Sequence, residues 1–552
     1  MKLTKILALI LAAILCTSMF TACLGGNDNE EDDRDDEDVE EKEEEEEAPS
    51  GEDKEDDTEE NDKKPSDPSE NEDEDESPVQ EELVPGDYIS ADYNGEDFTF
   101  LHIQRTSGNR DYYGGPYLDA DGITGLQVND AVYMRNLAVE EKYNVKIVER
   151  IEGSGYSEPS EILGSFYMSG DYCFDVVYGW GYKLGSCIVE GYFADASALP
   201  SVDMTKEYWA SSNLDELSIN GKTYIFTSDI SMNRIDWANM LFFNKDLVTE
   251  YGLEDSVGNF YDLVNNGQWT IDKYLEAITS VSNDIGTDGT IDAMTDTYGL
   301  ITGTSSGYAE ALACGVELVT KNDDGTYALA YYNGDNVDLA NKIREVFSDS
   351  RYVKDYMDVE AETTDIPEGM DIWQYFRSPF ANGNTLFLTG APNLAFELAG
   401  TTFDYGILPM PKRDENQSSH LSIIDANAAL FAIPSTYRQD MSTAGPDRTG
   451  AILEYMSAAS NEIVVPAYYN TLFKGGMGEK EDIDMLKIIK NNTKYVLVNM
   501  VSTYGDNLSL ISTCCEDMFY NPNTATTMYR TKSTVMQKAL NDFYADIMKL
   551  DQ

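Results

Sequence analysis

Two short motifs in this 552-residue chain have the residue types and spacing that catalysis or metal binding requires. The first, residues 303–307 (GTSSG), fits the G-x-S-x-G pattern of a serine nucleophile and follows an apolar run typical of a strand. Such a nucleophile needs a histidine base, and the chain has only His102 and His420. His420 lies downstream, with Asp404 and Asp414 between, so the order of a triad is not excluded. No HGGG-like oxyanion loop accompanies the motif, and we predict no catalytic residues.

The second motif is an Asp-rich stretch, residues 284–292 (DIGTDGTID), which is similar to a degenerate calcium-binding loop. Gly286 stands where such a loop has an oxygen ligand, and Thr295 stands where its final carboxylate belongs. A polar surface turn accounts for the stretch better than weak calcium binding does. We therefore predict neither a metal site nor a cofactor.

The N-terminal end has the pattern of an export signal. Two lysines precede an apolar run from Ile6 to Leu15, and small residues precede Cys23. The run is shorter than the roughly 20 residues that a membrane-spanning helix needs. The Thr-Ala-Cys ending resembles a bacterial lipobox, whose cysteine accepts a diacylglycerol group, although Phe20 stands where Leu is usual. We predict a signal peptide over residues 1–22, a lipid on Cys23, and a position on the outer face of the bacterial cell membrane.

A long acidic segment follows Cys23. Residues 27–82 contain 33 Asp and Glu but only 5 Lys and Arg, without apolar periodicity. Such a segment buries nothing that would offset its ordering entropy, so residues 23–85 are predicted to be a disordered linker. Its like charges repel one another and extend it, which suits a spacer between a lipid surface and a domain.

The remainder of the chain, about 470 residues, has a globular composition and exceeds one ordinary hydrophobic core, which predicts two lobes. The net charge of −64 predicts no nucleic-acid partner, because phosphate binding needs clustered Lys and Arg. Five cysteines remain beyond the leader and Cys23, irregularly spaced and without a CxxC pair, which supports neither a disulfide framework nor a zinc site. We expect Cys173 and Cys187 to be small buried thiols, although a disulfide between them stays open.

Apolar runs of strand length alternate with stretches of helical spacing along this part of the chain. Residues 129–143, for example, have apolar side chains at the spacing of a helix. The alternation predicts an α/β fold with mostly parallel sheets, in which ligands bind at the carboxyl ends of strands. The predicted strands are residues 98–104, 145–148, 174–178, 241–243, 298–301, 385–388, 405–408 and 429–433.

Eight short segments, in order along residues 97–470, give the chain a family resemblance. They are FDVV (174–177), LSINGKTY (217–224), LFFNKDL (241–247), WTIDKY (269–274), FANGNT (380–385), LTGAP (388–392), FDYGILPMP (403–411) and FAIP (431–434). In these segments the chain resembles family 1 extracellular solute-binding proteins, the maltose-binding-like receptors of ABC importers. The resemblance implies a two-lobe, periplasmic-binding-protein-like type II fold with a hinge and an interlobe cleft. It places lobe 1 at residues 95–235 and 384–425, and lobe 2 at residues 236–383 and 426–552.

The same resemblance implies a cleft lined by aromatic and polar side chains. Sugars present apolar faces and a rim of hydroxyls, so carbohydrate sites combine flat rings with carboxylate or amide partners. Trp180 follows a predicted strand and Trp237 precedes another, so these two are the leading stacking residues. Pro392 lies where the family frequently has a Trp, which weakens stacking from that side. The predicted ligand-binding residues are Trp180, Trp237, Asp229, Tyr178, Tyr182, Asp236, Tyr308 and Asn393.

Together these features predict a lipid-anchored, monomeric receptor that captures an extracellular solute and delivers it to an ABC permease. A sugar or oligosaccharide is the expected solute, because the chain has abundant aromatic residues, including 36 Tyr and 5 Trp. Two alternatives stay open: a secreted hydrolase with a carboxylate pair in its cleft, and a surface sensor or adhesin with the same fold.

Overall fold

The computed structural model describes residues 83–551 except 85, 104–116, 121, 154–157, 172, 304–306, 363–365, 436–444, 475–478 and 506. These residues belong to one compact unit, Gln80–Gln552. The predicted signal peptide, Cys23 and residues 27–82 of the acidic linker lie outside the described residues, as does Ser305 of the G-x-S-x-G motif. Val84, at the end of the predicted linker, is buried against the hydrophobic core.

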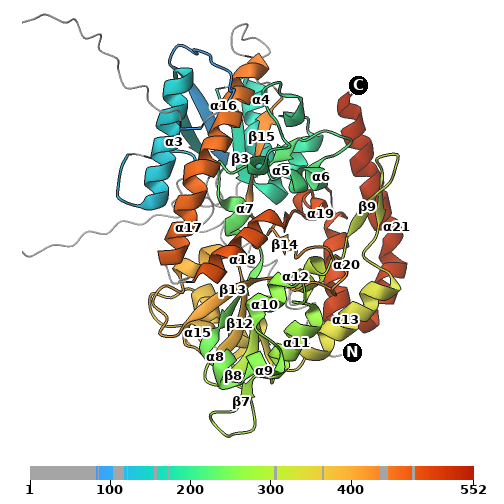
Figure 1. The fold of residues 1–552 in the computed structure, drawn as a ribbon. Helices are drawn as coiled ribbons and strands as arrows, with labels where there is room; N and C mark the ends of the chain where they lie inside the picture. Colours follow the sequence, from blue (N-terminus) through green and yellow to red (C-terminus); the bar gives the residue numbers. More distant parts are fainter. Residues whose placement is uncertain are drawn as a thin grey trace, which may run out of the picture. The chain divides into compact units, whose positions relative to one another are not determined.

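The first of two large sheets contains the apolar runs of residues 96–226 and one run near residue 430 (Figure 1). Its strands lie in the order β2 (Val145–Glu152), β1 (Glu96–Ile103), β3 (Val176–Trp180), β15 (Ala429–Pro434) and β4 (Phe193–Ala194), and β5 (Ile225–Phe226) pairs with β15. Helices α3 (Gln127–Tyr143) and α16 (Gly445–Ala459) cover one face of this sheet. Helices α4 (Pro159–Ser169) and α5 (Gly181–Val189) pack against the other.

The second sheet contains the runs of residues 240–409. Its strands lie in the order β11 (Val353–Asp355), β8 (Thr297–Thr302), β12 (Thr385–Gly390), β6 (Met240–Asn244) and β13 (Tyr405–Pro409), and β7 (Ser282–Asn283) pairs with β8. Helix α8 (Lys245–Glu250) begins directly after β6, because the Asn244 side chain accepts hydrogen bonds from the backbone of Asp246 and Leu247. Helix α18 (Lys480–Asn491) packs on β13.

The two sheets share one topology. Each sheet begins with three parallel strands, and the strand that comes first of these three in the sequence lies between the other two. An antiparallel strand lies next to them, and a strand parallel to the first three follows it. The antiparallel strands, β15 and β6, are those that the chain forms directly after it crosses from the other sheet. Apart from these two and the short β7, the strands run in one direction within each sheet, as predicted, but the antiparallel strands make most of the pairings, so both sheets are mixed. This doubled arrangement is the two-lobe α/β, type II fold that the resemblance implied.

Two crossing segments pair with each other between the sheets. The first, residues 227–239, connects β5 to β6, and the second, residues 410–428, connects β13 to β15. Ala238 and Ile424 form an antiparallel bridge between them. A third connection leaves α16 through the helical turn η4 (Ser460–Val464) and α17 (Val465–Lys474), which lead to α18.

The predicted lobe boundaries are wrong in the C-terminal half. Residues 384–425 were expected in lobe 1, but β12 and β13 pair with β6 in the second sheet. Residues 426–552 were expected in lobe 2, but β15 pairs with β3 in the first sheet, and α16 packs on the same sheet. Long-range strand pairing decides the lobe, and adjacency in the sequence does not predict it. Below, the first and second lobes are the two sheets with their own helices.

The C-terminal helices contact both lobes. Helix α19 (Leu497–Met500) packs on α5 of the first lobe and on α20 (Ser509–Tyr520). Helix α20 packs in turn on α12 (Tyr308–Ala313) of the second lobe and on α21 (Pro522–Ile547). One hydrophobic cluster therefore runs from the first sheet through these helices to the second sheet. Within the described part of the chain, no helix has the length and apolarity needed to cross a membrane.

Candidate functional site

Three of the predicted aromatic residues contact residues 425–429, which include the end of the second crossing segment and the first residue of β15. Tyr182, directly beyond the end of β3, donates its backbone N–H to a carbonyl of this segment at 3.2 Å. The Trp237 carbonyl accepts a hydrogen bond of 3.0 Å from an N–H of the same segment. Trp180 is the last residue of β3 and pairs in register with Ala429. The fold thus brings these aromatic residues together, and we call Trp180, Tyr182, Trp237 and the segment 425–429 the aromatic site.

The rings of the aromatic site differ in accessibility. Trp180 and Tyr182 stack, with ring centroids 5.4 Å apart and an interplanar angle of 27°. Trp180 is only 4% exposed, whereas Tyr182 and Trp237 are half-buried. The ammonium of Lys183 lies 5.3 Å from the centre of the Tyr182 ring. Tyr182 and Trp237 are therefore the more accessible of the three rings, and Trp180 stacks on Tyr182.

The same segment carries two polar residues that the sequence analysis missed. The Asp425 carboxylate accepts hydrogen bonds of 2.7 Å from both the backbone and the side-chain amide of Asn427. Both residues are half-buried. The sequence feature that could have identified them is a pair of polar residues just before the apolar run of β15, where the chain crosses between the sheets. Accessible rings beside a carboxylate and an amide have the composition that carbohydrate recognition requires.

Tyr308 is linked to the aromatic site through α19. It is the first residue of α12 and is half-buried. Burial raises the pKa of the Tyr308 phenol. Ser512 donates to the Asn499 side-chain oxygen at 2.6 Å. Because α12 packs on α20, and α19 packs on both α20 and α5, these helices connect the second lobe to the helix that begins beyond Trp180.

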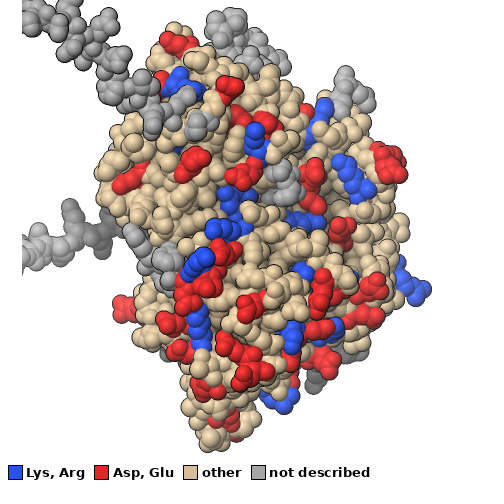
Figure 2. All heavy atoms as spheres, in the orientation of Figure 1, with Lys and Arg blue, Asp and Glu red and all other residues tan. Residues whose placement is uncertain are grey.

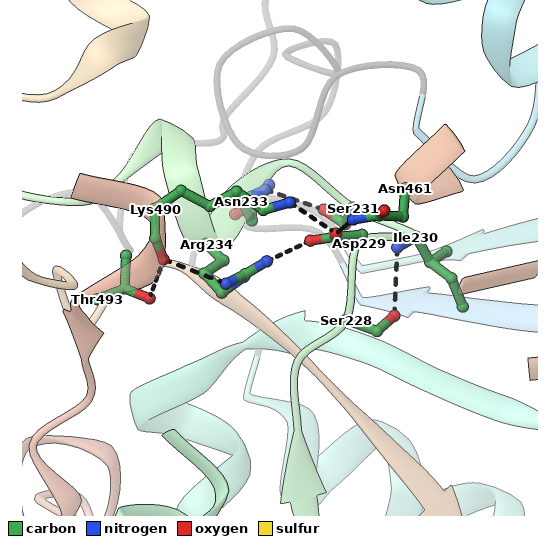
Figure 3. A network of polar contacts seen from close by, with 9 residues as sticks. All are labelled: Ser228, Asp229, Ile230, Ser231, Asn233, Arg234, Asn461, Lys490 and Thr493. Atoms are coloured by element: carbon green, nitrogen blue, oxygen red, sulfur yellow. Dashed lines mark hydrogen bonds and ion pairs between the residues drawn. The ribbon is translucent and has the colours of Figure 1, made fainter. Parts of the chain in front are cut away.

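Asp229 lies in a buried network on the first crossing segment (Figure 3). Its carboxylate forms an ion pair with Arg234 and accepts hydrogen bonds from Lys490 at 3.0 Å and Asn461 at 2.7 Å. Burial alone would raise the pKa of Asp229, but the guanidinium of Arg234 and the ammonium of Lys490 outweigh it and lower the pKa. Asp229 is 1% exposed, so its carboxylate is buried together with these partners. We call these four residues the hinge network.

Asp236 lies further along the same segment in a different environment. It ends the short helix α7 (Asn233–Asp236) and accepts hydrogen bonds from the Tyr117 hydroxyl at 2.8 Å and from the Tyr468 hydroxyl. Burial raises the pKa of Asp236 to about 6, although both phenols oppose the rise. No cation pairs with this carboxylate among the described residues.

Tyr178 and Asn393 are the two remaining predicted contacts. The Tyr178 hydroxyl is hydrogen-bonded to Ser231 at 2.7 Å, and its ring packs in the core of the first sheet at 1% exposure. Asn393 lies in the helical turn η3 (Pro392–Phe396), which packs against α7 and α17, and is half-buried. The side chains of Asp229, Asp236 and Tyr178 thus make hydrogen bonds within the protein.

A cavity of about 300 Å³ lies beside the crossing segments. Residues from α6 (Ser211–Leu217) of the first lobe and from β9 (Val319–Lys321) beyond α12 line it. Lys494 also lines this cavity, and its ammonium forms an ion pair of 2.9 Å with the carboxylate of Glu216. None of the predicted ligand-binding residues lines this cavity.

The structure describes His420 and the Asp-rich loop, whereas Ser305 of the first motif lies outside the described residues. The Nδ1 atom of His420 lies 2.9 Å from the Met410 carbonyl, and burial lowers the pKa of this histidine. In the Asp-rich loop, Asp296 accepts hydrogen bonds from the backbone of Ile285 and Asp292. No group of three His, Cys, Asp or Glu residues is placed to hold a metal ion in the part of the chain that the structure describes.

The cysteine expectations are confirmed only in part. Cys187, Cys314, Cys514 and Cys515 are buried, whereas Cys173 is exposed and contacts Arg150. All five are free thiols, so the open possibility of a disulfide between Cys173 and Cys187 is not realised.

No family model and no curated protein matches the chain. The solved structures that it is similar to include the galacto-N-biose-/lacto-N-biose I-binding protein of Bifidobacterium longum, with a TM-score of 0.48 and 12% identity, covering 82% of this chain and 98% of that one. UspC of M. tuberculosis has a TM-score of 0.49 and 12% identity, covering 80% and 100%. The ABC substrate-binding protein Lmo0181 of Listeria monocytogenes, in complex with cycloalternan, has a TM-score of 0.45 and 13% identity, covering 82% and 98%. At these scores, the fold assignment rests on the strand order of the two sheets.

Proposed function

We propose that the protein is a lipid-anchored, extracellular receptor that binds a sugar or oligosaccharide and delivers it to an ABC permease. The observation that carries the proposal is the aromatic site. Tyr182 and Trp237, both half-buried, are hydrogen-bonded through their backbones to residues 425 and 426, next to the hydrogen-bonded side chains of Asp425 and Asn427. Segments that cross between lobes are where closure brings both lobes to a bound solute.

A binding screen with a turnover control tests this function. The full chain is heated with mono- and oligosaccharides, and with peptides as the competing class. A solute that binds only the folded state stabilises it by about 2.7 kcal/mol at a hundred times Kd, which appears as a higher melting temperature. Recovery of the unchanged sugar supports a receptor. A shift with peptides alone, or cleavage of the sugar, rejects this proposal in favour of another solute class or of the hydrolase.

Two tryptophan variants locate the solute within the aromatic site. Trp237→Ala is expected to weaken binding roughly thirtyfold, because removing an aromatic anchor costs on the order of 2 kcal/mol. Trp180→Ala is expected to cost about 3–5 kcal/mol of folding stability, because its ring is packed. Melting temperature and calorimetric binding are measured for each variant. Trp373→Ala is the control, since Trp373 is 41% exposed and its ring lies 4.6 Å from that of Tyr356, outside the aromatic site as defined above. Unchanged affinity in a folded Trp237→Ala variant would place the solute elsewhere.

The lipid anchor is tested separately at Cys23. Cys23→Ala is expected to abolish metabolic labelling with a radioactive fatty acid and to release or stall the protein, because the thiol is the proposed acceptor. A diacyl group supplies the two chains that stable membrane retention needs. A variant that remains labelled would show that the anchor is attached elsewhere or that the leader has another function.

A further inference from the structure

The hinge network joins parts of the molecule that belong to different lobes. Asp229 lies between the two sheets on the first crossing segment, and Figure 3 shows its partners converging on it from three directions. Arg234 lies on the same segment, whereas Asn461 and Lys490 come from two different helical elements. Basic side chains gather over α7 and α18 in the middle of the face drawn in Figure 2.

Asn461 belongs to the first lobe. It lies in η4, which packs on α3 and α16. The neighbouring Ser460 accepts a hydrogen bond of 3.2 Å from Arg135, a fully buried residue of α3. Arg135 also donates to the Ile230 carbonyl at 3.0 Å, so the first lobe holds both η4 and the beginning of the crossing segment.

Lys490 belongs to the second lobe. It lies in the last turn of α18, whose Asp482 accepts a hydrogen bond of 3.1 Å from the backbone of Ile407 in β13. The same carboxylate accepts a hydrogen bond of 2.6 Å from Tyr261 of α10 (Phe260–Asn265), which also packs on β13. The position of Lys490 is therefore fixed by the second sheet.

We infer that Asp229 is an interlobe brace, in which Asn461 of the first lobe and Lys490 of the second are held on one buried carboxylate. Rotation of one lobe about the crossing segments moves these two donors apart and removes one of them from Asp229. A buried charge that loses a partner becomes less stable, so the network favours the lobe arrangement in which both contacts form. This inference goes beyond the proposed function, because it holds whatever the solute is.

Arg234 gives the brace its second property. It shares the crossing segment with Asp229, so this ion pair persists when the lobes move. The carboxylate then keeps one cation in every arrangement, and breaking the contact with Lys490 does not leave an isolated buried charge. Such a contact biases an equilibrium between lobe arrangements without locking it.

Lys490→Met tests the brace, because it removes the second-lobe donor and leaves the Asp229–Arg234 pair intact. Spin labels are attached through unnatural amino acids at Lys146 and Ser256, which are exposed residues of the first and second lobes. Interlobe distances are measured on the full chain without solute by electron paramagnetic resonance. We expect Lys490→Met to increase the population of a second distance at least about fivefold, the lower limit of typical coupling between sites.

Two matched variants complete the test. Lys487 lies about one turn before Lys490 on α18, and Lys487→Met removes only an exposed ion pair with Asp484. We therefore expect this variant to have the same interlobe distances as the unsubstituted chain. Lys490→Arg keeps a cation within reach of Asp229 and is expected to restore those distances. A folded Lys490→Met variant with unchanged distances overturns the brace. If Lys490→Met does not fold, Asn461→Ala is measured instead, because it removes only the first-lobe donor. We expect it to increase the population of the second interlobe distance, and unchanged distances in this variant overturn the inference.

Discussion

Asp229 and Asp236 are two buried carboxylates on one crossing segment, and they have opposite kinds of partner. Asp229 is held by a guanidinium, an ammonium and an amide, and Asp236 is held by two phenols. Both are nearly inaccessible, at 1% and 8% exposure. Burial acts against the charged form at each site, so the partners decide which form the protein favours.

The charge of the donors explains the difference between the two sites. The two cations lower the pKa of Asp229 in spite of burial, so this carboxylate is ionised at neutral pH. Phenols donate hydrogen bonds but bring no charge, and the pKa of Asp236 remains raised at about 6. One crossing segment thus contains a permanent anion and a group that titrates near physiological pH.

The largest effect that tests this comparison is expected from Asp229→Ala. The variant leaves Arg234 and Lys490 buried side by side without their carboxylate, which costs about 3–5 kcal/mol of unfolding free energy. Denaturant unfolding at pH 7 measures the loss. Asp484→Ala, which removes an exposed ion pair with Lys487, is the control and is expected to cost less than about 1 kcal/mol. Equal losses in the two variants would show that the hinge network contributes no more than a surface pair.

The partners of Asp229 also show what the sequence could not predict. Asp229 was predicted to be a ligand contact, whereas its partners Asn461 and Lys490 are 232 and 261 positions away in the sequence. No local pattern connects residues at such separations, and a buried ion pair looks the same in sequence as a ligand contact. The predicted role of a solute contact therefore came from the resemblance and not from the partners.

The strands and the aromatic site show the opposite case. Apolar runs located the strands well, because a buried strand must be apolar wherever it pairs. Trp180, Tyr182 and Trp237 were predicted to lie together, and the backbone contacts with residues 425–429 bring them together. The sheet that receives β12 or β15 was predicted wrongly, because strand membership depends on pairing across hundreds of residues.

The second test uses the pH dependence of stability at Asp236. Its folded pKa of about 6 lies above the unfolded value of about 3.9, so between these values only the folded state keeps the proton. The stability that this group contributes is therefore fully present below about pH 4 and is lost as the pH rises through 6. The shift corresponds to about 3 kcal/mol. Asp229, with a lowered pKa, has the opposite sign and loses its contribution as the pH falls below the unfolded value.

Asp236→Asn removes the pH dependence of stability that Asp236 contributes, because the amide resembles the neutral acid at every pH. Unfolding free energies of the unsubstituted chain and of the variant are compared from pH 4 to 7. We expect the unsubstituted chain to lose about 3 kcal/mol relative to the variant over this range. Parallel curves for the two proteins would mean that Asp236 is ionised throughout and that the phenols stabilise the anion as well as cations do.

The smallest effect is expected from Tyr468→Phe, which removes one of the two phenol donors to Asp236. A hydrogen bond to a charged group contributes about 1.5–3 kcal/mol, so we expect a loss of about 2 kcal/mol at pH 7, where the carboxylate is ionised. At pH 4.5 the neutral acid needs the donor less, and the loss is expected to fall below about 1 kcal/mol. Tyr469→Phe is the matched control, because the Tyr469 hydroxyl makes no hydrogen bond to the described residues. If the cost of Tyr468→Phe is the same at both pH values, the phenol stabilises the packing of α17 and not the charge on Asp236, and the contrast with Asp229 then rests on burial alone.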